Sequence, residues 1–213
     1  HEDWTVAMAE GFERSFRRCR KRHPTACDAT WARLQNFLDR WLNNPLLGPG
    51  FNLPGWVHAE GKGVLAVDQG SRAGLTQLRL YLWLDEAERV VWLVRIGDKS
   101  TQYADVAYCH DWVIGFKSRD EDKHSKVRTY RDVFALVADL GYSPKSVAGL
   151  RRKAAETDFT AMLEARRQAA GLTQAEMAMR MGVTQSTVSR LESDRWQDLR
   201  LGELDAYLRA CVK

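Results

Sequence analysis

Apolar side chains near the start of the chain recur at helical spacing after one short strand-like run. Residues 4–8 are the strand candidate, and residues 10–22 and 29–43 are two helix candidates. The apolar positions that recur every three or four residues are Phe12, Phe16 and Cys19 in the first helix and Trp31, Leu34, Leu38 and Trp41 in the second. Asn44-Pro45 and the Gly- and Pro-rich stretch after it are expected to end the second helix.

Strand spacing replaces helical spacing between residues 64 and 96. Over residues 78–84 leucines alternate with Arg79, Tyr81 and Trp83, which predicts a strand with one apolar face. A polar turn at residues 85–88 separates it from an apolar, β-branched run, so the two runs predict a hairpin.

Two further elements complete the predicted fold of this half. Residues 64–67 are a strand candidate, and residues 101–116 are expected to be helical. The order β-α-α-β-β-β-α then predicts an α+β domain in which helices pack on an antiparallel sheet.

A polar segment marks the predicted boundary between two domains. Lys117–Lys126 contains no large apolar side chain, and every periodic segment after it is helical. The sequence therefore predicts an α+β domain over residues 1–116, a linker over 117–128 and an all-α domain over 129–213.

Composition narrows the possible functions without choosing one. The chain has 213 residues and a formal net charge of +4, and residues 1–116 hold 14 basic and 14 acidic side chains. The positive excess therefore lies in the C-terminal part, which permits binding to a polyanion. No stretch approaches the ~20 apolar residues of a membrane helix, and the first residues lack the pattern of a secretory signal. We expect a cytoplasmic protein without a membrane partner.

Cysteine and histidine positions give no sign of a metal or a cofactor. Cys19, Cys27, Cys109 and Cys211 form no Cys-x-x-Cys pair, and the five histidines show no ligand spacing. The chain also lacks a phosphate loop and a nucleophile motif. No cofactor and no metal are expected, and a metabolic enzyme finds no support.

The most informative motif is GLTQAEMAMRMGVTQSTVSRLESDR, residues 171–195. Thr173 and Glu176 have the spacing of a capping box that opens a helix, with Ala175, Met177, Ala178 and Met181 as its apolar face. Gly182 suits a tight turn, and Thr184 suits the cap of a second helix, in which Val188 and Leu191 are apolar. The exposed positions of that helix carry Gln, Ser, Thr and Arg, which can hydrogen-bond base edges, whereas an ordinary solvated helix is Glu- and Lys-rich.

This segment closely resembles the helix-turn-helix of the XRE/Cro family of DNA-binding domains. The resemblance implies that the second helix lies in the major groove of operator DNA. It implies base contacts by Gln185, Ser186 and Thr187, and a phosphate contact by Gln174. Arg190 suits a contact to a base or to a phosphate, and Ser189 lies on the same exposed face. Arg195 suits a phosphate contact. Members of the family often dimerise through the last helix, which implies a homodimer on a palindromic operator.

The residues before this motif resemble the helical lead-in of HigA-type antitoxins. The alternative interpretation is that these are simply extra helices completing a five-helix DNA-binding domain. The predicted hairpin and its sequel, Leu78–Val106, resemble the end of RelE/HigB-type toxins, and a helix rich in arginine near the start of the chain agrees with that order of elements.

The toxin resemblance implies a metal-independent ribonuclease that cleaves mRNA on the ribosome. Arg79 and Arg95 would bind the phosphate, Lys99 would add a positive charge, and Tyr103 would assist proton transfer. Each has an ordinary interpretation: Arg79 as a solubilising strand residue, Lys99 as a turn residue, and Tyr103 as a ring packed on its neighbours. Residues 56–77 offer only Lys62 and Arg72 as cations, fewer than active relatives carry on these strands.

Two hypotheses therefore remain for the whole chain. In the first, the protein is a fused toxin and antitoxin, an autorepressor whose nuclease is held inactive by the C-terminal part. In the second, it is a transcriptional regulator whose toxin-like domain is catalytically dead and serves dimerisation or partner binding. Ribosomes and mRNA are candidate partners of the N-terminal domain, and RNA cleavage by the isolated domain distinguishes the two hypotheses.

Overall fold

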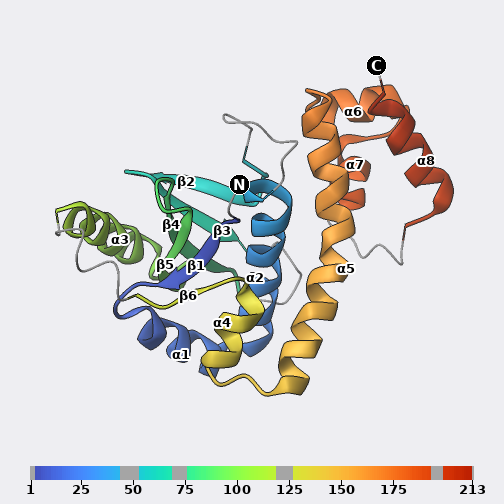
Figure 1. Cartoon of the computed structure of the whole chain (residues 1–213). Helices are drawn as coiled ribbons and strands as arrows, with labels where there is room; N and C mark the ends of the chain where they lie inside the picture. Colours follow the sequence, from blue (N-terminus) through green and yellow to red (C-terminus); the bar gives the residue numbers. More distant parts are fainter. Residues whose placement is uncertain (1–2, 44–52, 69–75, 119–126, 193–198, 213) are drawn as a thin grey trace.

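A six-stranded sheet with helices around it is joined by one long helix to a group of three short helices (Figure 1). The computed structural model describes residues 3–43, 53–68, 76–118, 127–192 and 199–212. The long helix, α5 (Pro144–Ala169), contains 26 residues. Within the described chain, no helix has both the length and the apolarity that crossing a bilayer requires.

The sheet has the strand order β2-β3-β4-β5-β1-β6. Its strands are β1 (Thr5–Met8), β2 (Val57–Gly61), β3 (Val64–Asp68), β4 (Leu78–Asp85), β5 (Val90–Asp98) and β6 (Thr129–Tyr130). The predicted hairpin is confirmed as β4 and β5. The sheet is mixed, however, because β1 pairs parallel with β5. The expectation of an antiparallel sheet was therefore wrong, since parallel partners lie far apart in sequence and leave no hairpin signal.

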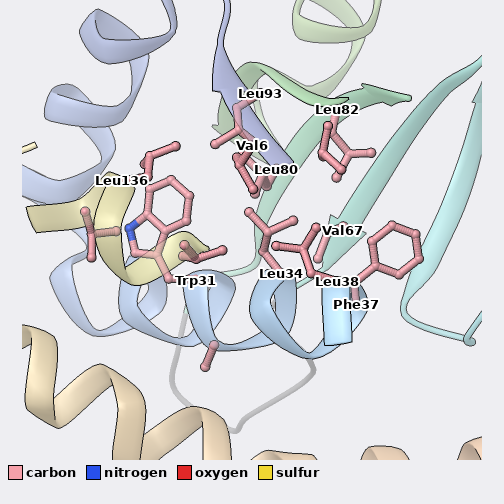
Figure 2. Close-up of a cluster of buried hydrophobic side chains, with 14 of the residues drawn as sticks. Val6, Trp31, Leu34, Phe37, Leu38, Val67, Leu80, Leu82, Leu93 and Leu136 are labelled. Atoms are coloured by element: carbon pink, nitrogen blue, oxygen red, sulfur yellow. The ribbon is translucent and has the colours of Figure 1, made fainter. Parts of the chain in front are cut away.

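One face of the sheet holds the main apolar core. It is covered by α1 (Phe12–Arg22), α2 (Pro24–Phe37), the π-helical turn η1 (Leu38–Leu42) and α4 (Val133–Asp139). Trp31 and Leu34 of α2 point toward Leu80 and Leu93 of the sheet, with Leu136 of α4 beside them (Figure 2). The second helix begins at Pro24 rather than near residue 29, as Pro is favoured in the first turn.

The other face of the sheet is covered by α3 (Gln102–Lys117). Aromatic rings meet in this contact, with Trp92 and Phe116 centroids 4.8 Å apart and Trp83 and Phe116 centroids 5.2 Å apart. Because β5 lies inside the sheet and is covered on both faces, its sequence is a nearly continuous apolar run.

The core of the sheet extends beyond the boundary predicted at residues 117–128. Tyr130 and Val133 belong to the same buried cluster as the sheet, and so do Leu150 and Ala154 of α5. Of the predicted linker, Lys117 ends α3, residues 119–126 lie outside the described chain, and β6 begins at Thr129. Helical periodicity shows that these later residues bury one side, but it does not show against which partner.

Candidate nucleic-acid interface

Helix α6 (Gln174–Met181) begins with the capping box that its sequence predicts. The backbone N–H of Glu176 donates to Thr173 Oγ1 at 3.2 Å, and the backbone N–H of Thr173 donates to Glu176 Oε2 at 2.7 Å. The backbone N–H and the hydroxyl of Thr173, which both donate to the Glu176 carboxylate, hold the pKa of Glu176 below its ordinary value. Met177 and Ala178 are buried, whereas Ala175, expected on the same apolar face, is exposed.

A tight turn and a second cap place helix α7 (Gln185–Leu191) across α6. Gly182 has a φ of 67°, in the left-handed region that favours glycine. Thr184 Oγ1 accepts a hydrogen bond from the backbone N–H of Thr187 at 3.2 Å and so caps α7. Val188 and Leu191 are buried in an apolar cluster with Met177, which fixes the inner side of α7.

A buried ion pair holds the C-terminal end of α7. Glu192, its cap residue, receives two hydrogen bonds from Arg167 of α5, Nε to Oε1 at 2.7 Å and Nη2 to Oε2 at 2.9 Å. The hydroxyl of Tyr207 in α8 (Leu201–Ala210) donates to the same carboxylate, and its oxygen lies 3.0 Å from the Leu163 carbonyl oxygen. Burial and the carboxylate of Glu192 raise the pKa of Tyr207 far above its ordinary value. Two helices, α5 and α8, are thus tied to the end of α7.

The opposite, N-terminal end of α7 carries the residues predicted to contact bases. Gln185 and Ser186 are exposed, and Thr187 is half-buried. Ser189, one turn further along, is half-buried as well. Because the cap at Glu192 is rigidly held, the exposed side chains of Gln185 and Ser186 extend from a fixed helix.

The other predicted DNA contacts are engaged within the protein or lie outside the described chain. Gln174 Nε2 donates to Glu192 Oε2 at 2.9 Å, so the amide is part of the buried pair's shell. Arg190 Nη2 donates to Glu203 Oε1 of α8 at 2.6 Å. Arg195 lies outside the described residues.

Comparison with known proteins supports the C-terminal part alone. Residues 158–211 match the model of a family described as a helix-turn-helix domain. These residues form a helix-turn-helix domain. No curated protein and no solved structure matches the chain. The match begins inside α5, so this helix belongs to the sheet's core at its start and to the helix-turn-helix domain at its end.

The arginine predicted to bind phosphate on β4 is surrounded by carboxylates. Arg79 Nη1 donates to Glu60 Oε1 at 3.2 Å, and Arg79 Nε lies 3.1 Å from Asp68 Oδ1. His58 Nε2 lies 3.1 Å from the other oxygen of Asp68. Arg79 is thus an internal ion-pair partner, not the solubilising surface residue that alternation along the strand suggested.

A β-bulge brings the second predicted arginine to the same face of the sheet. Tyr81 pairs with Arg95 and Leu82 with Leu93, so Val94 is an extra residue in β5. This shift turns Arg95 toward α3, where its Nε donates to Asp105 Oδ1 at 2.9 Å. Its guanidinium also lies 4.6 Å from the ring centroid of Tyr108.

The four predicted catalytic residues do not form one open cationic site. Arg79 and Arg95 are diagonal neighbours on the sheet, but Glu60, Asp68 and Asp105 contact them and give the group a formal negative excess. Lys99 is exposed in the turn before α3, and Tyr103 is 92% exposed, so its ring is not packed on the described neighbours as its ordinary interpretation expected. No group of residues suited to holding a metal ion occurs in the described part of the chain.

Sequence reasoning missed the acidic partners of these sites. Glu192 was visible only as a charge after α7, and Asp105 only as a polar residue in a predicted helix. One signal was available for Asp105: it lies at i+4 from Thr101, whose Oγ1 donates to Asp105 Oδ2 at 2.6 Å. The ion pairs of Arg79 in β4 with Glu60 in β2 and with Asp68 in β3 depend on the register of the sheet, which no local sequence pattern specifies.

Proposed function

We propose that the protein is a DNA-binding transcriptional regulator in which α7 lies in the major groove of operator DNA. Gln185, Ser186 and Thr187 contact base edges in this arrangement. The amide of Gln185 offers a donor and an acceptor in one plane, which suits a bidentate contact to adenine.

One observation carries this proposal: the two ends of α7 differ in how they are held. Its C-terminal end is fixed by the bidentate Arg167–Glu192 pair, while Gln185 and Ser186 at its start are exposed. A recognition helix needs this combination, because base contacts require polar side chains of fixed position that are free to meet DNA.

The flanking residues contact phosphates rather than bases in this proposal. Gln174 begins α6, where the helix N-terminus favours an anion, but its amide contacts a phosphate only by giving up its hydrogen bond to Glu192 Oε2. Ser189 and Arg195 are further candidates. Arg190 exchanges Glu203 for a phosphate only at the cost of an existing ion pair, so its contribution to affinity is smaller than its exposed position on α7 suggests.

For the sheet domain we propose the second hypothesis, a domain without ribonuclease activity that serves dimerisation or partner binding. The carboxylates of Glu60, Asp68 and Asp105 support it, because they compensate the charges of Arg79 and Arg95 and repel a phosphate. Two protomers would then present two copies of α7 to a palindromic operator.

Selection from a random-sequence DNA duplex pool tests the DNA-binding proposal. The full chain is expected to enrich one sequence motif, with two-fold symmetry if the protein dimerises, and Gln185→Ala is expected to relax the preference at one position of each half-site. Recovery of unenriched sequences would contradict specific DNA binding.

The first hypothesis makes the C-terminal part the inhibitor of the nuclease, so the test of the sheet domain incubates translating ribosomes with residues 1–156, which lack the helix-turn-helix domain. We expect intact mRNA, with the same result for Arg79→Ala. Cleavage that Arg79→Ala abolishes would favour the fused toxin and antitoxin instead.

A further inference from the structure

Helix α1 has an outer face made almost entirely of cations. Its inner face buries Phe12, Phe16 and Cys19 in the main core. We define the α1 basic face as the exposed cations of this helix: Arg14, Arg17, Arg18, Lys21 and Arg22. Since residues 1–116 are balanced in charge overall, α1 concentrates a positive charge that the rest of this region lacks.

The cations of the α1 basic face differ in whether an acidic side chain contacts them. Arg17 forms an i,i+4 pair with Glu13, Nη2 to Oε1 at 2.5 Å. Among the residues that the structure describes, Arg14, Arg18, Lys21 and Arg22 form no ion pair. Their charges are therefore free to attract an anion.

Helix stability does not explain this arrangement. Arg14 lies in the first turn of α1, where the helix dipole disfavours a cation. Arg14, Arg18 and Arg22 follow one another at i,i+4 spacing, where like charges destabilise a helix. The helix dipole favours Lys21 and Arg22, which lie in the last turn, but it does not account for Arg14 and Arg18.

The chemistry of the face favours phosphate in a nucleic acid. Four of its five residues are arginines, whose planar guanidinium matches phosphate oxygens. A membrane surface is disfavoured because the apolar side chains of α1 are all buried, which leaves nothing to enter the lipid.

The position of α1 relative to α7 favours duplex DNA as the nucleic acid that the α1 basic face contacts. The guanidinium of Arg20 stacks on Tyr142, 3.7 Å from the ring centroid, immediately before α5 begins, whereas Arg167 holds α7 near the end of α5. Figure 1 shows α1 and the helix-turn-helix at opposite ends of α5. The 26 residues of α5 span roughly 39 Å, close to the ~34 Å of one DNA turn.

We propose that the α1 basic face binds the phosphate backbone of the duplex whose major groove α7 occupies, about one turn away from that groove. The inference rests on the proposed function, because binding through α7 raises the local concentration of duplex DNA beside α1. It adds sequence-independent affinity to the specific contacts of α7.

The test compares two variants of the full chain that lose the same charge. Arg18→Gln/Arg22→Gln removes two cations from the α1 basic face and keeps good helix formers. Lys62→Gln/Lys117→Gln removes two exposed cations elsewhere, in the β2–β3 turn and at the end of α3 on the other face of the sheet. Gln185→Ala reports the α7 contact separately. The probe is a duplex of about 30 base pairs carrying the motif selected by the wild type, titrated at several salt concentrations.

We expect Arg18→Gln/Arg22→Gln to weaken binding about ten-fold or more near 0.1 M salt, and to reduce the slope of log affinity against log salt by about two. The control pair is expected to match the wild type. Equal binding by both double variants, while Gln185→Ala weakens binding, would overturn the inference and leave the proposed function intact. Absence of duplex binding by the wild type would overturn both. The same variants are also titrated on a single-stranded RNA of equal length. If Arg18→Gln/Arg22→Gln weakens binding to this RNA but not to the duplex, the inference is overturned as well.

Discussion

Helix α3 can approach β5 closely because residue 97 of that strand is a glycine. A Cβ at Gly97 would lie 1.8 Å from Asp105 Oδ2 and 2.6 Å from Thr101 Oγ1. The close approach lets Asp105, which is almost fully buried, accept hydrogen bonds from both Thr101 and Arg95. The absence of a side chain at Gly97 therefore positions the carboxylate that neutralises Arg95.

Gly97→Ala is expected to lower the free energy of unfolding by about 2–4 kcal/mol, because the methyl group displaces Asp105 and separates a buried ion pair. Urea denaturation measures the change. Gly115→Ala is the matched control, since a Cβ there meets nothing within 4 Å and Gly115 lies inside α3. That control should raise stability by about 0.5–1 kcal/mol. Equal effects of the two substitutions would contradict the packing described for Gly97.

Glu192 has a similar role in the helix-turn-helix domain. Glu192→Ala leaves the buried guanidinium of Arg167 without its carboxylate, and we expect a loss of about 3–5 kcal/mol. Hydrogen exchange should show the loss in α6, α7 and α8 and little change in β5. Glu13→Ala breaks an exposed pair and should cost at most about 0.5 kcal/mol. Uniform loss of protection throughout the chain would be inconsistent with this local role.

At the scale of elements, the sequence predicted the features that depend on neighbouring residues but not the pairing of strands that lie far apart in the chain. The capping box of Thr173, the glycine turn at Gly182 and the β4–β5 hairpin depend on neighbours in sequence, and all are present. Strand β2 was missed because Val57 is its only β-branched residue and it ends in glycine, and β6 because it has only two residues. The parallel pairing of β1 with β5, and the bulge at Val94, involve partners that no local pattern specifies.

The site followed the same rule. The helices of the helix-turn-helix were predictable from caps and apolar spacing, but the partners of Gln174 and Arg190 come from α7's end and from α8. The ion pairs of Arg79 needed the register of three strands.

Helix α5 connects the two ends of the molecule, and Glu164 ties its second half to the sheet domain. Glu164 Oε1 accepts from the backbone N–H of Gly55 at 2.8 Å, and Oε2 accepts from Trp56 Nε1 at 3.2 Å. Burial raises the pKa of Glu164 above its ordinary value of 4.5, although the Gly55 N–H opposes this rise. A raised pKa in the folded state means that the folded protein holds this proton at a pH where the unfolded chain has lost it.

The contribution of Glu164 to the free energy of unfolding is therefore expected to increase as pH falls from the raised pKa toward 4.5. This contribution is lost as pH rises through the raised pKa. We expect the wild type to gain stability relative to Glu164→Gln between about pH 7 and about pH 5, measured by denaturation at both values. Glu156→Gln, in the same helix but partly exposed, controls for the charge removed. An unchanged difference between wild type and Glu164→Gln would contradict the raised pKa.

At the scale of the whole molecule, the buried ion pairs and the exposed polar residues are separated. The sheet domain compensates its internal arginines with carboxylates, while the unpaired cations of α1 and the polar start of α7 lie on the surface. This distribution is expected of a protein that binds a nucleic acid through its surface. It also explains why a charge count along the sequence did not predict the α1 basic face. The charges of residues 1–116 sum to zero although α1 is strongly basic.

The most direct test of DNA recognition by α7 is a fluorescence anisotropy titration of the full chain on its selected duplex and on a scrambled duplex. Gln185→Ala/Ser186→Ala should bind the selected duplex about ten- to a hundred-fold more weakly than the wild type and the scrambled duplex equally well. Gln102→Ala/Ser118→Ala, the same changes on α3 and at its C-terminal end, should bind both as the wild type does. Undiminished discrimination by Gln185→Ala/Ser186→Ala would contradict the assignment of α7 as the recognition helix.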